Sequence, residues 1–357
     1  MVEVDLALSS LYKPGNCTIV NTDSGSTDHT RRVFLDTATK CRKLSFNLSV
    51  EPKGKGRNLF HFFEWAMKND VTHLLTVDAD VSSMMGSWIE KLSSPLIREE
   101  SDFVTPLYRR DRFEAASTNH FAYPLVYGYL GTDIRQPIGG EFGMTRRAAK
   151  YILSRPIDTP AAYAYGVDIF ISMHLVAANF RTVQVDLGQK IHKPTFFKLS
   201  KIFRDVAETA ISISRQHPIS STFNNYSEPH TVEESGTPPN HALSHNIFLK
   251  ARREALNLEP LYKIWLAHRE SEFEALIHRE QPTMSIHGWS SLLAGCIAEA
   301  LANPTRSPED TADKLLPAFL LRTITFWTEV ENATSSAVAE TLLAQARMFR
   351  EELEQRI

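Results

Sequence analysis

The sequence predicts an α/β protein with a mostly parallel β-sheet flanked by helices, followed by an all-helical C-terminal region. Short apolar runs alternate with amphipathic stretches over residues 1–215. Several of these runs end in small polar or acidic residues, as the carboxyl ends of parallel strands do. Beyond residue 241, apolar residues recur at helical spacing. We therefore expect an α/β domain over residues 1–215, a linker or long loop over 216–241 and a helical region over 242–357.

The composition is that of a globular protein. The chain has 357 residues, of which 43% are hydrophobic, and its net charge of −3 gives no reason to expect nucleic acid as a partner. Three widely spaced cysteines, Cys17, Cys41 and Cys296, form neither a disulfide framework nor a zinc motif. No apolar run is long enough to span a membrane, and no signal peptide is visible. We therefore expect reduced thiols and a cytoplasmic location.

Apolar spacing and turn residues locate the individual elements. Strands are expected at residues 17–21, 46–50, 74–77, 103–107 and 181–187. Helices are expected at residues 2–13, 58–68, 88–96, 118–130, 166–178 and 198–214, with a further helix beginning near Thr30. In the helix at 58–68, the residues expected to face the core are Leu59, Phe62, Phe63 and Ala66.

Two carboxylates directly follow the strand at 74–77. Asp78 and Asp80 are separated by one alanine, at the strand end where ligands of open α/β sheets bind. Two close carboxylates repel each other unless a cation lies between them, and hard oxygen ligands suit Mg²⁺ or Mn²⁺. The alternative is a polar turn in which Asp80 caps the next helix. Both interpretations stay open from the motif alone.

Other polar segments follow strands in the same way. Asp23 and Ser24 open a small polar turn before a helix, a layout that places backbone donors near a nucleotide. Lys55 stands between two glycines and suits a phosphate. Each segment is equally compatible with a turn that binds nothing.

Three further segments have the same two interpretations. Gly139 and Gly140 precede Glu141 and allow backbone to approach a ligand closely. His192 lies just beyond a strand end and could complete a metal site. The third segment follows the strand at 103–107 and contains Arg109, Arg110 and Arg112. These arginines could bind an anion or form a solvated turn.

The order of these motifs resembles a known family. Asp-Ser-Gly-Ser-Thr-Asp, Gly-Lys-Gly, Asp-Ala-Asp, Gln-Pro-Ile-Gly-Gly-Glu, Tyr-Gly-Val-Asp and Lys-Ile-His follow one another in the chain. This is similar to nucleotide-sugar glycosyltransferases of the GT-A fold, and more narrowly to retaining enzymes that make glucosylglycerate, mannosylglycerate or glucosyl-3-phosphoglycerate. The resemblance covers residues 5–214. Its most specific part is the pair Gln-Pro-Ile-Gly-Gly-Glu and Tyr-Gly-Val-Asp together with the late histidine.

The resemblance implies roles for individual residues. Asp23 and Ser24 would contact the nucleotide, Lys55 the diphosphate or base, and Asp78 the ribose or sugar. Asp80 and His192 would hold Mg²⁺ or Mn²⁺. Gly139, Gly140 and Glu141 would line the donor sugar, so Asp78, Asp80 and Glu141 form the catalytic set. Acceptor contacts would come from Thr118, Tyr165, Gly166, Val167 and Asp168.

The chain departs from the family in two places that affect function. Such enzymes begin with a strand ending in Pro-x-Tyr/Phe-Asn-Glu, whereas Met1 here stands at the start of the following helix. We therefore expect a sheet without that strand, with unpaired backbone groups on the strands beside it. Phosphoglycerate-using relatives carry an arginine and an asparagine where this chain has Ala116 and Pro194. Neither side chain can bind a phosphate, which favours an unphosphorylated acceptor unless a nearby arginine substitutes.

The function expected from the resemblance is a retaining, metal-dependent hexosyltransferase. It would move glucose or mannose from UDP-glucose or GDP-mannose to glycerate or a similar small hydroxy acid. The helical C-terminal region would support a homodimer. One alternative is a GT-A enzyme with a lipid or polysaccharide acceptor. The other is a non-catalytic nucleotide-binding remnant, which the missing first strand favours.

Overall fold

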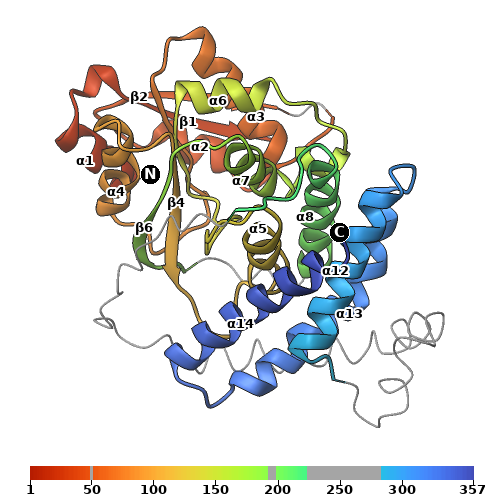
Figure 1. Cartoon of the computed structure of the whole chain (residues 1–357). Helices are drawn as coiled ribbons and strands as arrows, with labels where there is room; N and C mark the ends of the chain where they lie inside the picture. The colour runs from red at the N-terminus through yellow and green to blue at the C-terminus, as the bar shows by residue number, and fades with distance from the viewer. Residues whose placement is uncertain (49–50, 192–197, 223–282) are drawn as a thin grey trace. The chain divides into compact units, whose positions relative to one another are not determined.

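The computed structural model describes residues 1–48, 51–191, 198–222 and 283–357, and these form two compact units. The first unit consists of residues 1–109 and 136–191, and the second of residues 110–135, 198–222 and 283–357 (Figure 1). The predicted boundary at residue 215 stays a prediction. Residues 110–135 nevertheless belong to the same unit as the C-terminal helices, because the helices within 110–135 pack against those C-terminal helices.

The strands of the first unit form two sheets. The parallel pair is β1 and β2, with Thr18 opposite Arg42. The other sheet has the order β3-β5-β4-β6, in which β4 and β6 are parallel and β5 runs antiparallel to both neighbours. The bounds are β1 Thr18–Asp23, β2 Arg42–Asn47, β3 His73–Leu75, β4 Phe103–Arg109, β5 Gly143–Thr145 and β6 Thr182–Gln189.

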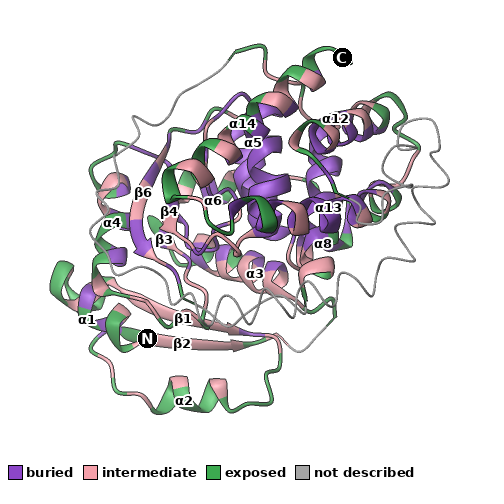
Figure 2. Ribbon diagram, turned by 90° about the horizontal axis from the view of Figure 1, so that it is seen from below, coloured by how far each residue is buried: buried purple, intermediate pink, exposed green. Residues whose placement is uncertain are grey.

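The parallel pair and the larger sheet share no strand pairing among the described residues. Among the described residues, β1 pairs with β2 alone and β3 pairs with β5 alone. Figure 2 shows the strands of the parallel pair at intermediate burial, while β4 is largely buried. The predicted strand at 46–50 is shifted toward the N-terminus, because the pairing with β1 begins at Arg42. Residues 49 and 50 lie outside the described part.

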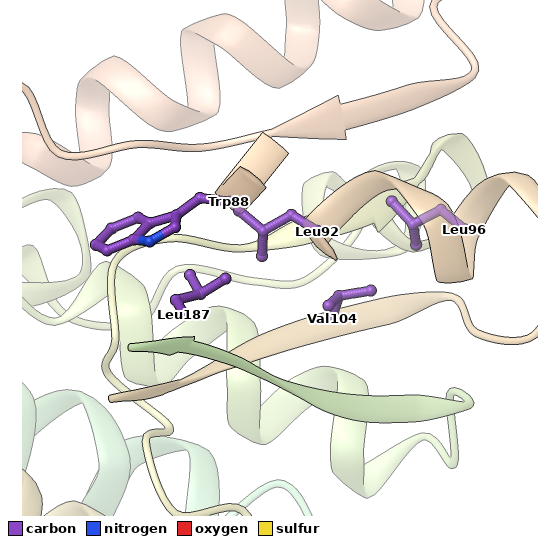
Figure 3. Close-up of a cluster of buried hydrophobic side chains, with 5 residues drawn as sticks. All are labelled: Trp88, Leu92, Leu96, Val104 and Leu187. Atoms are coloured by element: carbon purple, nitrogen blue, oxygen red, sulfur yellow. The ribbon is translucent and has the colours of Figure 1, made fainter. Parts of the chain in front are cut away.

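Helices cover both sheets of the first unit, and most of the expected helices are present within a few residues. A cluster on one face of the larger sheet consists of Trp88, Leu92 and Leu96 from α4 with Val104 and Leu187 from the strands (Figure 3). The bounds are α1 Val2–Leu11, η1 Pro14–Asn16, α2 Thr30–Asp36, α3 Lys55–Lys68, α4 Gly86–Ile97, α6 Arg146–Leu153, η3 Pro160–Tyr163 and α7 Val167–Ala177.

The core face of α3 differs slightly from the expected one. The structure buries Phe63 and Ala66, as predicted, but buries Phe60 where the sequence suggested Leu59 and Phe62. Phe60 meets Phe170 of α7 edge to face, with ring centroids 5.6 Å apart. This partner comes from over a hundred residues further along the chain, so spacing within α3 could not identify it.

The regular elements of the second unit in its described part are helices, which confirms the helical prediction for residues 283–357. Residues 242–282 lie outside the described part. Phe203 of α8 stacks on Phe319 of α13 with ring centroids 4.0 Å apart, and the ring of Phe349 on α14 lies against Gly128 of α5. No described helix combines the length and apolar character needed to cross a membrane. The bounds are η2 Thr118–Ala122, α5 Tyr123–Tyr129, α8 Leu199–Ser214, α12 Ile286–Ala302, α13 Pro308–Val330 and α14 Ser335–Glu354.

One of the three clustered arginines has a structural role. Arg112 donates hydrogen bonds to the carbonyl groups of Val330, Glu331 and Ala333, at 2.8, 3.0 and 2.6 Å. These carbonyls lie at the C-terminal end of α13, where backbone acceptors have no helical partner. Arg112 therefore holds the C-terminal end of α13. Whether it also contacts an acceptor stays a prediction.

Candidate active site

The residues after β3 are held against the segment that leads into β5. Thr76 is buried, and its Oγ1 donates to the carbonyl of Gly140 at 2.8 Å and accepts from the amide of Phe142 at 2.9 Å. The amide of Thr76 also donates to the carbonyl of Phe142 at 2.8 Å. These bonds bring Asp78 next to Glu141, whose Oε1 accepts from the Asp78 amide at 3.2 Å. Two of the predicted catalytic carboxylates are thus neighbours.

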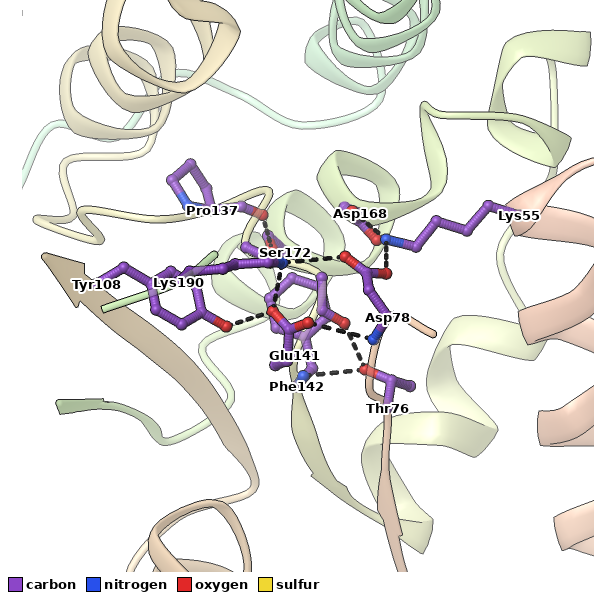
Figure 4. A network of polar contacts seen from close by, with 12 residues as sticks. Lys55, Thr76, Asp78, Tyr108, Pro137, Glu141, Phe142, Asp168, Ser172 and Lys190 are labelled. Carbon is purple, nitrogen blue, oxygen red and sulfur yellow. Dashed lines mark hydrogen bonds and ion pairs between the residues drawn. The ribbon is translucent and has the colours of Figure 1, made fainter. Parts of the chain in front are cut away.

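Lys190, at the end of β6, joins these carboxylates. Its ammonium donates to Asp78 Oδ2 at 3.0 Å, to Glu141 Oε2 at 2.7 Å and to the Gly139 carbonyl at 2.9 Å. Only 4% of its side chain is exposed. Tyr108 of β4 donates a hydrogen bond to the same oxygen, Oε2 of Glu141 (Figure 4). Neither Lys190 nor Tyr108 was predicted from the sequence, although the Lys-Ile-His motif contains Lys190.

Lys55 extends the arrangement to α7. Its ammonium lies 2.8 Å from Asp78 Oδ1 and 2.8 Å from Asp168 Oδ2. We call Lys55, Asp78, Glu141, Asp168 and Lys190 the lysine–carboxylate network (Figure 4). In this network, two lysine ammonium groups face three carboxylates. The five residues lie in α3 and α7 or directly beside β3, β5 and β6.

The glycines on either side of Lys55 allow close packing. A Cβ on Gly54 would collide with the carbonyl of Tyr163, and one on Gly56 with the carbonyl of Ala162. The Gly56 amide donates to the carbonyl of Ala164 at 3.2 Å. These contacts bring the start of α3 against the segment before α7, so that Lys55 reaches Asp168. The Gly-Lys-Gly motif therefore has a packing reason in addition to the phosphate contact expected for Lys55.

The two glycines before Glu141 have a similar explanation. Gly140 has φ +89°, and a Cβ there would overlap the Asp78 carboxylate. A Cβ on Gly139 would strike the ring of Pro106 on β4. The pair lets the backbone approach Asp78 and leaves the Gly139 carbonyl free to accept from Lys190.

Burial and mutual charge shift the pKa values in the network. Burial raises the pKa of Glu141, and the charge of Asp78 raises it further. Lys190 acts to lower this pKa but does not outweigh them. Burial also raises the pKa of Asp168, against Lys55. Burial acts in the same direction on Asp78, but Lys55 and Lys190 outweigh it and lower the pKa of that carboxyl. Asp78 is therefore the ionised member, and Glu141 and Asp168 are the members that take up a proton most readily.

Lys55 stays protonated for the complementary reason. Burial acts to lower its pKa, yet the carboxylates of Asp168 and then Asp78 outweigh burial and raise it. The Oδ1 atom of Asp168 is buried and has no hydrogen-bond partner among the described residues. A buried carboxylate oxygen in that state favours a donor group, such as a hydroxyl of a bound substrate.

Asp80 differs from the rest of the predicted catalytic set. It is exposed and makes no hydrogen bond or ion pair with any described residue. Within the described ranges, no group of three or more His, Cys, Asp or Glu side chains could hold a metal ion. His192, the other predicted ligand, lies outside the described residues. A single available carboxylate still fits a divalent cation that keeps water and phosphate oxygens as its other ligands.

The segment leading to residue 192 is held beside Asp80. Ile191 is the last described residue before 192–197. Its carbonyl accepts from the Ser82 amide at 2.8 Å and from Ser82 Oγ at 3.1 Å, and its amide donates to Ser83 Oγ at 2.8 Å. Two serines that carried no predicted role therefore connect the end of β6 to the Asp78–Asp80 segment.

The predicted nucleotide turn is built by its own side chains. Asp23 is buried, and its Oδ1 accepts from the amides of Gly25 and Ser26 and from Ser26 Oγ, at 3.1, 2.8 and 2.7 Å. Ser24 Oγ donates to Asn58 of α3 at 2.7 Å. These bonds fix the turn that follows β1. The nucleotide contacts assigned to Asp23 and Ser24 stay predictions.

The predicted acceptor residues fall in different units. Tyr165, Gly166, Val167 and Asp168 lie at the start of α7 in the first unit, and Asp168 belongs to the lysine–carboxylate network. Thr118 opens η2 in the second unit and is buried there. The acceptor role of these residues stays a prediction.

The fold and the site together define a class of protein. A mixed α/β sheet presents Asp78 and Asp80 beyond a strand end, with lysines beside them. Residues 4–152, which include β1 to β5, match the profile of glycosyl transferase family 2. The protein is therefore a glycosyltransferase with the GT-A fold, as the motif order predicts.

Several solved structures are similar to the chain. One is glucosyl-3-phosphoglycerate synthase from Mycobacterium tuberculosis with phosphoglyceric acid, at 23% identity over 62% of this chain and 79% of that one, with a TM-score of 0.47. The same enzyme with Mn²⁺, UDP-glucose and phosphoglyceric acid gives 22% identity over the same shares and a TM-score of 0.44. A structure described as a mycobacterial protein gives 25% identity over 61% and 71%, with a TM-score of 0.48. No curated protein matches the chain. The assignment to glycosyltransferases rests on the family 2 match.

Proposed function

We propose that this glycosyltransferase transfers glucose or mannose from a nucleoside-diphosphate sugar to glycerate or a similar small hydroxy acid, with retention of configuration. The observation that carries the proposal is the lysine–carboxylate network beyond β3. Lys55 and Lys190 supply positive charge at the strand end where a diphosphate would bind, and ionised Asp78 lies between them. Glu141 lies beneath, fully buried, with oxygens that can accept from sugar hydroxyls.

The network fits the chemistry of a charged leaving group. Negative charge develops on the diphosphate as the glycosidic bond breaks, and the two lysines can stabilise it. In a retaining reaction, the acceptor hydroxyl approaches the face that the diphosphate leaves. A phosphate oxygen can then accept the hydroxyl proton, so no protein nucleophile is needed. This differs from retaining glycosidases, in which a second carboxylate attacks the sugar.

Asp80 and His192 are the residues that would hold Mg²⁺ or Mn²⁺. The ion would add charge stabilisation at the diphosphate. Asp80 supports this role because it is exposed and uncommitted, and because Ser82 and Ser83 fix the segment that leads to residue 192. The remaining residues position the donor: Gly140 lets the backbone approach Asp78, and Asp168 offers a buried oxygen to a hydroxyl.

The acceptor would be an unphosphorylated acid. Ala116 and Pro194 stand where phosphoglycerate-using relatives carry an arginine and an asparagine. Of the arginines that would substitute, Arg109, Arg110 and Arg112, the last already donates to the carbonyls at the end of α13. A lipid or polysaccharide acceptor is the alternative within the same class. We also infer a cytoplasmic enzyme that acts as a homodimer, which size-exclusion chromatography with light scattering would test.

The deciding assay combines the protein with UDP-glucose or GDP-mannose, glycerate and Mn²⁺. We expect release of the nucleoside diphosphate that depends on glycerate and exceeds the release seen with 3-phosphoglycerate. NMR should show an α-linked product. Release only with another acceptor would assign that acceptor instead. Donor binding by calorimetry without release across all donors and acceptors would favour a non-catalytic nucleotide-binding protein.

Changing Asp80 to Ala tests the metal assignment. Because Asp80 is exposed and contacts no described residue, Asp80→Ala should leave the free energy of unfolding within about 0.5 kcal/mol of wild type. It should remove the Mn²⁺-dependent part of UDP-glucose binding measured by calorimetry. Glu100→Ala, which removes another exposed carboxylate, is the matched control. Unchanged Mn²⁺-dependent binding in Asp80→Ala would show that the metal ligand lies elsewhere.

A further inference from the structure

Two of the three cysteines stand side by side at the start of the parallel strand pair. Thr18 pairs with Arg42, and Cys17 and Cys41 are the residues immediately before them. Paired strands lie about 4.8 Å apart. The Cα atoms of a disulfide are separated by about 4.4–6.8 Å, so this register suits a cross-link. Each thiol also shifts the pKa of the other, so the two side chains lie near one another.

The backbone around both cysteines is fixed by neighbouring groups. The Cys41 amide donates to Asp5 Oδ1 of α1 at 2.9 Å, and the Lys40 amide donates to the same carboxylate at 3.0 and 3.1 Å. The Cys17 amide donates to the Pro14 carbonyl at 3.2 Å. A cross-link would therefore join two positions that are already held in place.

The two thiols differ in access and acidity. Cys17 is half-buried, whereas Cys41 is 4% exposed. Burial raises the pKa of the Cys41 thiol to about 12, with a further contribution from the Asp5 carboxylate, and burial also raises the pKa of Cys17. The more accessible Cys17 is the thiol that reacts first, and its reaction should accelerate as the pH rises.

We propose that Cys17 and Cys41 are a dithiol that closes to an intrachain disulfide in the presence of a small disulfide oxidant such as glutathione disulfide. The Cys17 thiolate attacks one glutathione sulfur, the glutathione S–S bond breaks, and one glutathione thiolate leaves. The Cys41 sulfur then attacks Cys17 and displaces the second glutathione. Two protein S–H groups become one S–S bond, and glutathione disulfide is reduced to two thiols that take up the protons.

The cross-link would stabilise the less buried of the two sheets. Of the twelve residues in β1 and β2, Asp23 alone is buried, and a two-stranded sheet is weakly stable by itself. A bond between the amino ends of both strands restricts the unfolded chain over the segment from Cys17 to Cys41. The site lies outside the lysine–carboxylate network, so this inference does not depend on the proposed function.

The test uses the full-length protein with glutathione disulfide at mildly alkaline pH, followed by alkylation and digestion without reduction. We expect a linked peptide that contains Cys17 and Cys41 and lacks two hydrogens, with Cys296 alkylated. The oxidised protein should unfold at a higher temperature than the reduced protein, and dithiothreitol should reverse the shift. A glutathione adduct on Cys17 without a linked peptide, or links to Cys296 or between chains, would overturn the proposal.

Single variants establish the order of the two steps. Cys41→Ser should trap glutathione on Cys17, whereas Cys17→Ser should acquire none while folded. Cys296→Ser, which removes the buried cysteine of α12, should leave the linked peptide unchanged. An adduct on Cys41 in folded Cys17→Ser would contradict the assigned order. The linked peptide in wild type remains the decisive measurement if a variant fails to fold.

Discussion

At the scale of single residues, Lys190 is an unpredicted residue that contacts Asp78, Glu141 and Gly139. It neutralises Glu141, whose side chain is fully buried, and holds Asp78 from the side opposite Lys55. A buried carboxylate that loses its cation is costly, because no water replaces the lost hydrogen bonds. Lys190 is therefore expected to affect both the stability of the fold and the charge state of the site.

Lys190→Met should lower the free energy of unfolding by about 3 kcal/mol, because it leaves Glu141 buried without its cation. The raised pKa of Glu141 should rise further, so the loss should be larger at neutral pH than near pH 4, where a protonated carboxyl is tolerated. Urea unfolding across this range measures the effect. Lys91→Met, at an exposed lysine of α4, is the control. Equal losses for Lys190→Met and Lys91→Met would show that the buried contacts carry no net stability.

Gly140→Ala tests the close approach to Asp78. The left-handed backbone at φ +89° costs an alanine about 1–2 kcal/mol, and its Cβ would displace the Asp78 carboxylate. We expect lower stability together with weaker UDP-glucose binding by calorimetry. Gly15→Ala is the matched control, because an added Cβ there meets no atom within 4 Å. Wild-type donor affinity in a folded Gly140→Ala protein would separate Asp78 from donor binding.

At the scale of elements, side chains at strand ends hold the site together. Ser82 and Ser83 join the segment after β3 to the end of β6, and Thr76 joins it to the residues before β5. At the opposite end of the larger sheet, Asp102 precedes β4 and binds Arg147 of α6 at 2.6 Å and Arg181 before β6 at 3.1 Å. Each of these contacts connects elements that are distant in sequence.

Asp102→Asn should destabilise the protein by about 2 kcal/mol at pH 7, because hydrogen bonds to two guanidinium groups lose their charge. Burial acts to raise the pKa of Asp102, but its bonds to Arg181 and Arg147 lower it overall. The contribution is therefore present above the unfolded pKa of about 4 and is lost as the pH falls toward the folded value. Urea unfolding should show that the difference in unfolding free energy between wild type and Asp102→Asn becomes smaller below pH 4.

Asp36→Asn provides the comparison for this titration. Asp36 pairs with Arg32 on α2, but both side chains are largely exposed, at 70% and 79%. Exposed pairs contribute little, so this variant should match wild type at every pH. If Asp102→Asn stays less stable than wild type by the same unfolding free energy down to pH 2, the charge of Asp102 does not stabilise the fold.

At the scale of the whole molecule, each unit has its own buried polar centre. In the second unit, Arg322 is fully buried and donates to Gln345 at 2.9 Å, to Glu329 at 3.0 and 2.8 Å and to the Met284 carbonyl at 2.9 Å. His120 lies against the same Gln345, and burial, aided by the Arg322 charge, holds its pKa well below the ordinary value. This network joins η2, α13 and α14.

Arg322→Met should therefore weaken the second unit while sparing donor binding. We expect a loss of about 3 kcal/mol in the unfolding free energy, because Gln345 and Glu329 lose a buried partner. UDP-glucose affinity, measured below the unfolding temperature, should stay within twofold of wild type. Arg32→Met, at an exposed arginine of α2, controls for loss of charge. Loss of donor affinity in the folded variant would show that the second unit contributes to donor binding.

The sequence by itself determined the succession of strands and helices, because apolar periodicity and turn residues are local properties. It also singled out Asp78, Glu141 and Lys55 in polar motifs beside strand ends or a helix start, and the family resemblance added Asp168. Their roles stay predictions.

Only the tertiary structure decided which of these residues meet, and which unpredicted residues join them. Lys190 reaches Asp78 across 112 positions of sequence, and Tyr108 reaches Glu141 across 33, because β4, β5 and β6 are neighbours in one sheet. Gly54, Gly56 and Gly140 are needed for contacts with distant backbone or side chains. Local patterns do not encode such contacts, since they depend on strand order and register, which the folded chain alone fixes.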